Sequence, residues 1–306
     1  MGRILTSQDV GFAVKGGSVF ACGGGGWADH GYELGNLAVT IGRPELVGIE
    51  EVAENDWIAT AAAIGAPAGL TDWQMLGIDY VNAFKRVEEA LGEPISGLMV
   101  GQNGMSSTLN AWLPSAVTGC KVIDAVGDLR AHPTGDMGSI GLAASPQPMI
   151  QAAVGGNRQN NSYIEMTITG ATAKVSPVIR TASDMSGGFI ASCRNPIPAS
   201  YVRHNAALGG ISLALSLGEA ITKAEKTNKV VDAICNHTGG KILCSGKVKS
   251  NSIRYTNEAF DIGTVTIGEG ANKHTIHIMN EHMAVENANG ERVATYPDVI
   301  TTLDRW

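Results

Sequence analysis

Several features that define large protein classes are missing from the sequence. No uncharged apolar run approaches the roughly 18 residues of a membrane-spanning helix, and residues 1–10 hold no stretch of signal-peptide length. The 22 Lys and Arg residues form no run, and Asp and Glu outnumber them at 29. Nucleic-acid binding needs a concentrated basic surface, so this balance argues against it. We therefore expect a cytoplasmic protein that binds neither membranes nor nucleic acid.

Cysteine is scarce and irregularly placed. The five cysteines are odd in number, widely spaced and without a CxxC pair, which favours reduced thiols over a disulfide framework or a zinc knuckle. Cys22 and Cys120 adjoin two loops discussed below, but a nucleophilic role needs a base partner that the sequence does not place. The chain also lacks the GxSxG, HExxH and GxxxxGK[ST] motifs.

What the sequence does contain is the composition of a globular protein, with 44% apolar and 17% charged residues. Residues 77–91 carry apolar side chains at spacings of three and four, which predicts a helix. The apolar segments 57–64, 95–100 and 121–126 predict strands that alternate with helices. This order favours the α/β class, with a layered main domain.

The pattern changes after about residue 160. Residues 162–170 and 172–180 predict a β-hairpin, since Ile164, Met166 and Ile168 alternate with polar neighbours. From residue 239 onward, short strand-like segments separated by turns predict a compact, mostly-β C-terminal module. The expected organisation is an α/β main domain of residues 1–160 and 200–238, a β-hairpin insertion at 161–199 and a β module at 239–306.

Four consecutive glycines, residues 23–26, follow a predicted helix over residues 6–20. Consecutive glycines can turn several backbone N–H groups toward one ligand, so Gly24 and Gly25 are candidate substrate-binding residues. A dinucleotide site would need a strand before the glycines, whereas a helix is predicted there. The alternative is a tight turn between two helices.

A second polar loop, residues 101–108, follows the predicted strand 95–100. Gln102, Asn103 and Ser106 offer amide and hydroxyl groups that could hydrogen-bond a polar ring. A serine of this loop could instead cap the helix that follows, and both roles can hold together.

The densest group of chemically active side chains lies at and just after the predicted strand 121–126. It contains three carboxylates, an arginine and a histidine: Asp124, Asp128, Arg130, His132 and Asp136. Ligands of open α/β sheets bind beyond the carboxyl ends of the strands, so this segment is the candidate active site. The alternative is a local salt-bridge cluster that only shapes the loop.

Each side chain has a chemical role in this hypothesis. Asp124, Asp128 and His132 are the candidate catalytic groups, because carboxylates and imidazole accept and donate protons. Arg130 is a candidate substrate-binding residue, since a guanidinium can hold a carboxylate through two parallel hydrogen bonds. Asp124, His132 and Asp136 are the candidate ligands of a divalent metal, which would be zinc, manganese or iron.

Short motifs also follow one another in a fixed order. Those of the first half are the glycines 23–26, the Gly-Ala-Pro turn 65–67, the Ala-Leu-Gly at 90–92 and the loop 101–107. Residues 124–133 then read Asp-Ala-x-Gly-x-x-Arg-Ala-x-Pro. Asn280-Glu281 precedes Pro-Asp-Val-Ile-x-x-Leu-Asp at 297–304. Over nearly the whole chain, these motifs resemble the S-methyl-thiohydantoin desulfurase domain family of bacterial cytosolic proteins.

Three positions depart from what many members of that family have. Val126 and Thr134 stand where acidic residues are common, and Gln102 stands where many members carry a glutamate. These losses could be compensated by other side chains of the same segment, namely Asp128, His132 and Asp136. The sequence also ends at Trp306, whereas typical members continue, so the resemblance is to a short subgroup.

The resemblance implies an activity on hydantoin-type rings. The family name implies desulfurisation of a thiohydantoin, and related hydantoinase and oxoprolinase systems imply ring opening. We therefore expect a homo-oligomeric hydrolase that attacks a ring carbon of a hydantoin, a thiohydantoin or a related cyclic amide. Two alternatives stay open: a non-catalytic partner subunit of a hydantoinase- or oxoprolinase-type enzyme, and a lyase or isomerase acting on a small organic acid.

Overall fold

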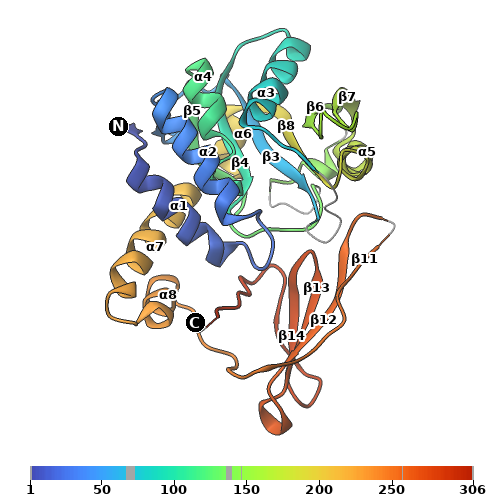
Figure 1. Ribbon diagram of the computed structural model, residues 1–306. Helices are drawn as coiled ribbons and strands as arrows, with labels where there is room; N and C mark the ends of the chain where they lie inside the picture. Colours follow the sequence, from blue (N-terminus) through green and yellow to red (C-terminus); the bar gives the residue numbers. More distant parts are fainter. Residues whose placement is uncertain (1, 67–72, 136–139, 146, 257, 305–306) are drawn as a thin grey trace.

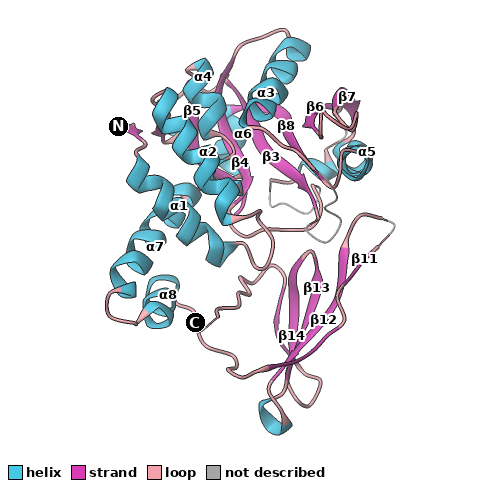
Figure 2. Ribbon diagram, viewed as in Figure 1, coloured by secondary structure: helices cyan, strands magenta, loops and turns pink. Residues whose placement is uncertain are grey.

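The computed structural model describes residues 2–66, 73–135, 140–145, 147–256 and 258–304, and it contains two β-sheets (Figures 1 and 2). A large mixed sheet lies among the helices, and a separate antiparallel sheet is formed by the C-terminal part of the chain. The predicted class, α/β with a layered main domain and a mostly-β C-terminal module, is therefore confirmed.

Among the described residues, the main sheet has nine strands, and its centre is parallel. The order is β1 (Arg3–Ile4), β2 (Glu45–Val47), β5 (Lys121–Asp128), β4 (Ile95–Gln102), β3 (Trp57–Gly65), β8 (Phe189–Pro198), β6 (Met149–Gly155) and β7 (Ile164–Gly170), with β9 (Ala207–Leu208) paired to β5. Strands β2, β5, β4 and β3 run parallel, whereas β8, β6 and β7 continue the sheet antiparallel. The carboxyl ends of β3, β4 and β5 therefore meet at one edge.

Both faces of this sheet are covered. The helices are α1 (Ser7–Phe20), α2 (Ala28–Ile41), α3 (Gly77–Leu91), α4 (Trp112–Thr118), α5 (Thr172–Met185), α6 (Ala199–Asn205), α7 (Gly210–Glu225) and α8 (Val230–Thr238). Side chains alternate along β4: Leu98 and Val100 join the core under α2, α3 and α4, and Met99 joins the core under α6. A strand buried on both faces explains the continuous apolar run at 95–100.

Local sequence signals place the helices that flank the site. The Thr6 side chain accepts a hydrogen bond from Asp9 N, and Asp9 Oδ2 accepts one from Thr6 N, which forms a capping box at the start of α1. Helix α3 ends at Gly92, whose φ of 75° suits a residue without a Cβ. Helix α1 packs on α7 at backbone distance, since a Cβ on Gly16 would lie 1.7 Å from Ala214 O. The predicted helices at 6–20 and 77–91 are confirmed.

The predicted hairpin is wrong in its second strand. Residues 164–170 form β7, but residues 172–185 form α5, and β7 pairs with β6 instead. The buried positions of α5 include Thr172, Val175, Ile179 and Ala182, which follow a helical spacing of three and four. Over so few residues, an alternating pattern and a helical pattern share positions that are four apart, such as Val175 and Ile179. The sequence of this segment alone therefore does not distinguish a strand from a helix.

The C-terminal sheet is antiparallel throughout. Its strands are β10 (Val248–Asn251), β11 (Arg254–Tyr255), β12 (Asp261–Ile267), β13 (His274–Met279), β14 (Glu281–Glu286) and β15 (Arg292–Thr295). The order is β10-β12-β13-β14-β15, with β11 beside β12. Asn280 alone connects β13 to β14, and its φ of 56° is left-handed, a conformation that Asn tolerates. The chain therefore turns back sharply at the tip of this hairpin.

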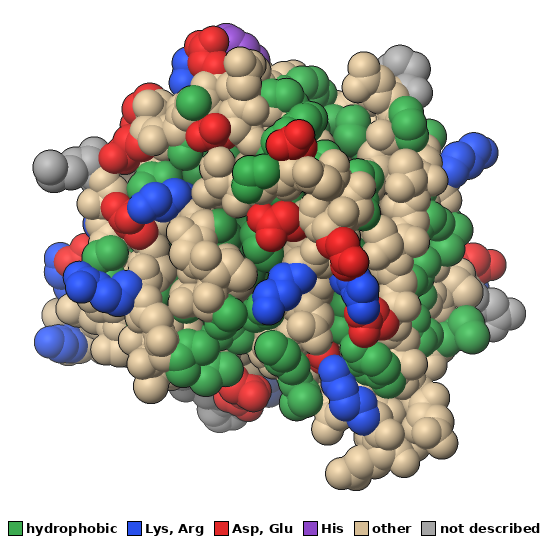
Figure 3. Space-filling view, turned by 90° about the horizontal axis from the view of Figure 1, so that it is seen from above, with side chains coloured by type: hydrophobic (Ala, Val, Ile, Leu, Met, Phe, Trp, Pro, Cys, Tyr) green, Lys and Arg blue, Asp and Glu red, His purple; other side chains and the backbone are tan. Residues whose placement is uncertain are grey.

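The surface agrees with the scattered charges of the sequence. Lys and Arg side chains lie singly among acidic and apolar ones on the face shown in Figure 3. No helix in the described ranges combines the length and the apolar character that crossing a membrane requires.

Candidate functional site

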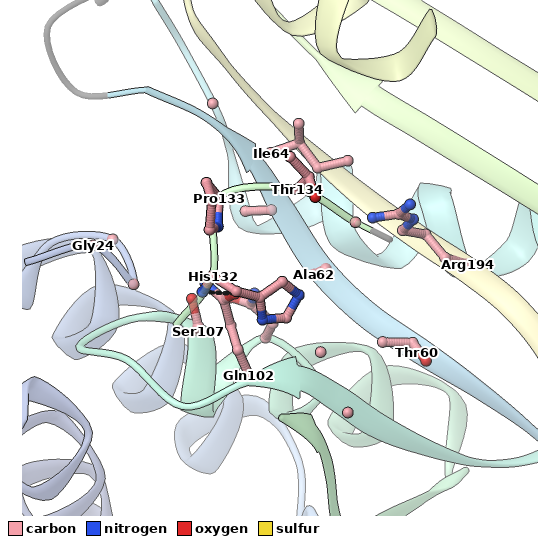
Figure 4. Close-up of a pocket in the computed structure, with 18 of the residues that line it drawn as sticks. Gly24, Thr60, Ala62, Ile64, Gln102, Ser107, His132, Pro133, Thr134 and Arg194 are labelled. Atoms are coloured by element: carbon pink, nitrogen blue, oxygen red, sulfur yellow. Dashed lines mark hydrogen bonds between the residues drawn. The ribbon is translucent and has the colours of Figure 1, made fainter. Parts of the chain in front are cut away.

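A cavity of about 120 Å³ lies at the edge where β3, β4 and β5 end (Figure 4). The strand ends contribute Ile64, Gln102 and Gly127, the α1–α2 connection contributes Gly24–Gly26, and β8 contributes Arg194. The tip of the β13–β14 hairpin closes one wall with Asn280 and Glu281. The cavity thus combines the expected crevice of a parallel sheet with a wall from the second sheet.

The α1–α2 connection reaches the cavity through its glycines, as predicted for Gly24 and Gly25. Gly25 has a φ of 72°, and a Cβ there would lie 2.6 Å from the Cα of Gly104. Its carbonyl accepts hydrogen bonds from the backbone N–H groups of Ser106 and Ser107. Glycine is therefore required at Gly25, because the backbone of this connection passes in direct contact with the backbone of the loop after β4.

Some side chains at the end of β4 and in the loop after it line the cavity, and others are buried in the protein. Gln102 lines the cavity, and its Oε1 accepts a hydrogen bond of 3.1 Å from the backbone N of His132. Asn103 is fully buried, donates to Gly210 O and accepts from Thr108. Ser106 is buried against Gly26, outside the lining, and its Oγ makes no hydrogen bond to a described residue. Of the three predicted residues, only Gln102 reaches the cavity.

Asp124 does not line the cavity with His132. Its Oδ1 accepts hydrogen bonds of 3.0 Å from the backbone N atoms of Ile211 and Ser212, and its Oδ2 accepts one of 2.5 Å from Ser212 Oγ. These donors form the first turn of α7, where a carboxylate satisfies free N–H groups and complements the helix dipole. The structure thus places the predicted catalytic Asp124 at a helix N-terminus.

His132 lines the cavity, and Asp128 lies behind it. The Nδ1 of His132 is 3.6 Å from Asp128 Oδ2, beyond hydrogen-bond distance, and this carboxylate oxygen accepts a hydrogen bond of 3.0 Å from the hydroxyl of Tyr296. Burial lowers the pKa of His132, an effect that the Asp128 carboxylate opposes. The imidazole is therefore neutral near pH 7 and able to accept a proton.

Arg130 is directed away from the cavity and into the protein. It is 1% exposed, and its guanidinium donates to the backbone carbonyls of Ala131 at 2.9 Å, His282 at 2.9 Å and Asp298 at 2.6 Å. It also lies 5.1 Å from the ring centroid of Tyr296. Arg130 thus joins the end of β5 to the C-terminal sheet, and in this structure it does not line the substrate cavity.

The predicted metal ligands are not assembled by the residues that the structure describes. Asp124 faces α7, and Asp136 lies outside the described ranges. Within those ranges, no group of three or more His, Cys, Asp and Glu side chains is arranged to hold a metal ion. The described donor set therefore does not fit the proposed metal, and no chemical step is assigned to one.

Burial keeps Cys22, which precedes the glycines 23–26, and Cys120, which precedes β5, in the thiol form. It raises the pKa of Cys22 to about 11 and that of Cys120 to about 11. Neither thiol lines the cavity. A nucleophilic thiolate would need the opposite shift.

The main site residue that the sequence did not indicate is Glu281. It is 4% exposed, lines the cavity, and its Oε2 makes no hydrogen bond to any other described residue. Burial raises the pKa of Glu281 to about 8, although the positive charges of Arg130 and Arg180 act in the opposite direction. The Asn280-Glu281 pair is one of the family motifs in the sequence. Sequence spacing alone cannot place it at the same cavity as His132, because about 150 residues separate the two positions.

Strand β8 and helix α5 supply two further cavity residues that the sequence did not indicate. Arg194 Nε donates to Gln151 Oε1 at 2.7 Å, and the Gln151 amide donates to Asn195 Oδ1 at 2.9 Å. Arg180 donates to the carbonyls of Pro133 and Ala259. Both arginines are held by hydrogen bonds, and both line the cavity, Arg194 from β8 and Arg180 from α5.

Fold and site together define a mixed α/β protein whose cavity at parallel strand ends is completed by a C-terminal antiparallel sheet. Family models for the N-terminal and C-terminal domains of S-Me-THD-like proteins match residues 8–165 and 171–306. The chain therefore belongs to the S-Me-THD-like family, which confirms the resemblance seen in the sequence motifs.

Among solved structures, the crystal structure of a protein from Chromobacterium violaceum is similar, with a TM-score of 0.75. The match covers 97% of this chain and 81% of that one at 20% sequence identity, so the likeness concerns the fold. Comparison with curated proteins gives no match.

Proposed function

We propose that this chain hydrolyses an S-methyl thiohydantoin or a closely related cyclic thioimidate. The observation that carries the proposal is the neutral His132 imidazole on the wall of a small cavity, with the Asp128 carboxylate 3.6 Å behind it. A buried neutral imidazole is suited to take a proton from water, and the carboxylate stabilises the imidazolium that forms. The membership of the chain in the S-Me-THD-like family supports the choice of ring.

The proposed reaction replaces sulfur by oxygen at the ring carbon between the two nitrogens. The oxygen of water bonds to this carbon while His132 takes one water proton, and the electron pair of the C=N bond moves to the ring nitrogen. The carbon–sulfur bond then breaks as the carbonyl forms, and the imidazolium gives its proton to the departing methanethiolate, which leaves as methanethiol. One hydrogen of water ends on sulfur and the other on the ring nitrogen, so no oxidant or reductant is needed.

The size and lining of the cavity support a small polar ring. A cavity of about 120 Å³ is smaller than most ligand pockets, which favours a compact ligand, and the lining offers the Gln102 amide and the backbone of Gly24–Gly26 to ring carbonyl and N–H groups. Ile64 and Phe189 supply apolar surface for the faces or the substituent of the ring. Binding in this space would also exclude bulk water from the reacting carbon.

The test is release of methanethiol from an S-methyl thiohydantoin by the full chain, followed with a thiol reagent. We expect turnover by the wild type, and a loss of at least about 100-fold in His132→Asn, the usual worth of general base catalysis. His204→Asn is the matched control, because His204 is exposed on α6. Absence of both thiol release and ring opening in the wild type, or full activity in His132→Asn, would contradict the proposal. A homo-oligomer and a hydantoinase-type partner stay predictions.

A further inference from the structure

The tip of the β13–β14 hairpin places a carboxyl group in the cavity opposite the strand ends. Glu281 is 4% exposed, and its surroundings leave it little freedom: a Cβ at Gly24 would lie 2.0 Å from Oε1 of Glu281. Its Oε2 makes no hydrogen bond to any other described residue. A buried, unpartnered carboxyl oxygen is costly, and such groups call for an explanation by function or by a bound ligand.

His282, the residue next to Glu281, is held by contacts with several segments of the chain. His282 N donates to Cys22 O at 2.7 Å, and His282 O accepts from Arg130 at 2.9 Å. The ring Nδ1 of His282 is 3.0 Å from Ile300 O, and a Cβ at Gly23 would lie 2.8 Å from its Nε2. These contacts fix the hairpin tip against the α1–α2 connection and the end of β5. A side chain held in this way is prepared for one geometry.

We propose that Glu281 is the catalytic acid of the cavity and donates the proton that the ring nitrogen receives. This inference deepens the proposed function and rests on it. As water adds to the ring carbon, the carboxyl proton of Glu281 moves to the nitrogen that takes the C=N electron pair. As the carbonyl forms, the carboxylate takes the proton of the added hydroxyl group. His132 and Glu281 thus both return to their starting states, and every proton is accounted for.

The charged and titratable groups near Glu281 act on its pKa in both directions. Arg130 faces it from the loop after β5, Arg180 from α5, Asp261 from β12, Cys22 from the α1–α2 connection and Tyr296 from the segment after β15. Burial has the largest effect, and it raises the pKa of Glu281 to about 8. His132 moves in the opposite direction, since burial lowers its pKa. Two groups whose environments separate their pKa values in this way form an acid and a base.

The experiment compares Glu281→Gln with the wild type in the thiol-release assay from pH 6 to 9. Gln keeps the size of the side chain and can donate a hydrogen bond through its amide N–H, but it cannot release a proton. We expect kcat/KM at pH 7 to fall at least about 100-fold, the usual worth of a general acid. We also expect the wild-type profile to decline above pH about 8 and the variant to lose this decline. Glu286→Gln is the control, because Glu286 is on the same strand but pairs with His277 and Arg292.

Two further readouts separate the possible failures. If the wild type is active and Glu281→Gln keeps its activity and its decline at high pH, Glu281 is not the acid, whereas the proposed function stands. An infrared titration of the wild type minus Glu281→Gln measures the carboxyl proton without any substrate. A carboxyl signal that persists at pH 7 supports the inference, and a carboxylate signal at pH 6 overturns it. A wild type that acts on no such ring contradicts the proposed function instead.

Discussion

Replacing Arg130 by Met tests how the C-terminal sheet is held to the main sheet. The guanidinium is 1% exposed and donates to three backbone carbonyls, of which His282 O and Asp298 O belong to the C-terminal part of the chain. Met keeps an unbranched side chain of comparable length in the space and removes every donor. The variant therefore isolates the hydrogen bonds and the charge from the packing of the stem.

The magnitude follows from the acceptors left behind. A buried acceptor that loses its partner costs about 1–3 kcal/mol, and three are affected here. Removing a buried charge returns part of its desolvation cost, which offsets some of this loss. We therefore expect the free energy of unfolding to fall by about 3–5 kcal/mol in Arg130→Met, at the upper end of single-substitution effects.

Urea denaturation followed by tryptophan fluorescence measures this change. Arg203→Met is the matched control. The Arg203 side chain is 32% exposed, and its guanidinium lies 3.2 Å from the carboxylate of Glu54, whose side chain is 71% exposed. Exposed pairs contribute less than about 1 kcal/mol, so the control should stay close to the wild type. If Arg130→Met lay within about 1 kcal/mol of the wild type, the role of Arg130 as the link between the sheets would be refuted.

Three other predictions concern residues around the cavity. Asp124→Ala should lower the free energy of unfolding by about 1–2 kcal/mol, as the loss of a helix cap does, and leave kcat within threefold; lost turnover in a folded variant would restore its catalytic role. Gly24→Ala should abolish turnover, because its Cβ would lie 2.0 Å from Glu281 Oε1. In the control Gly11→Ala, the new Cβ would meet no atom beyond its own helix backbone within 4 Å, so turnover should be unchanged. The pKa of Glu281 is raised by folding from 4.5 to about 8, so the folded chain binds the extra proton, and wild-type stability should fall as pH rises between these values. Chemical denaturation at pH 5 and pH 8 should show a smaller fall in Glu281→Gln; equal falls would count against a buried carboxyl.

Much of the fold followed from local patterns. Helix 77–91 was clear because its apolar spacing and the terminal Gly92 gave the same answer, and the strands at 57–64 and 95–100 were clear because they are apolar on both faces. Residues 172–180 were misread because so short a segment does not distinguish a strand from a helix by sequence pattern, although its buried positions follow the helical spacing. Tertiary packing, which the sequence pattern does not contain, decides between them.

The site was predictable only where it is local. His132, Gln102, Gly24 and Gly25 follow strand or helix ends, and all four line the cavity. Asp124 stands in the same segment but faces the start of α7, because the side chains of a strand alternate between its two faces. Glu281 could not be placed from sequence, since its position depends on how a distant hairpin docks onto the α1–α2 connection.

The hairpin tip also has a consequence for the order of events during synthesis. The last strand of the main sheet in the chain is β9, at Ala207–Leu208, whereas Glu281 leaves the ribosome more than seventy residues later. A nascent chain can therefore complete its larger sheet while one wall of the cavity is still missing. In the proposed reaction, chemical competence would begin only after the second sheet has been synthesised and has docked.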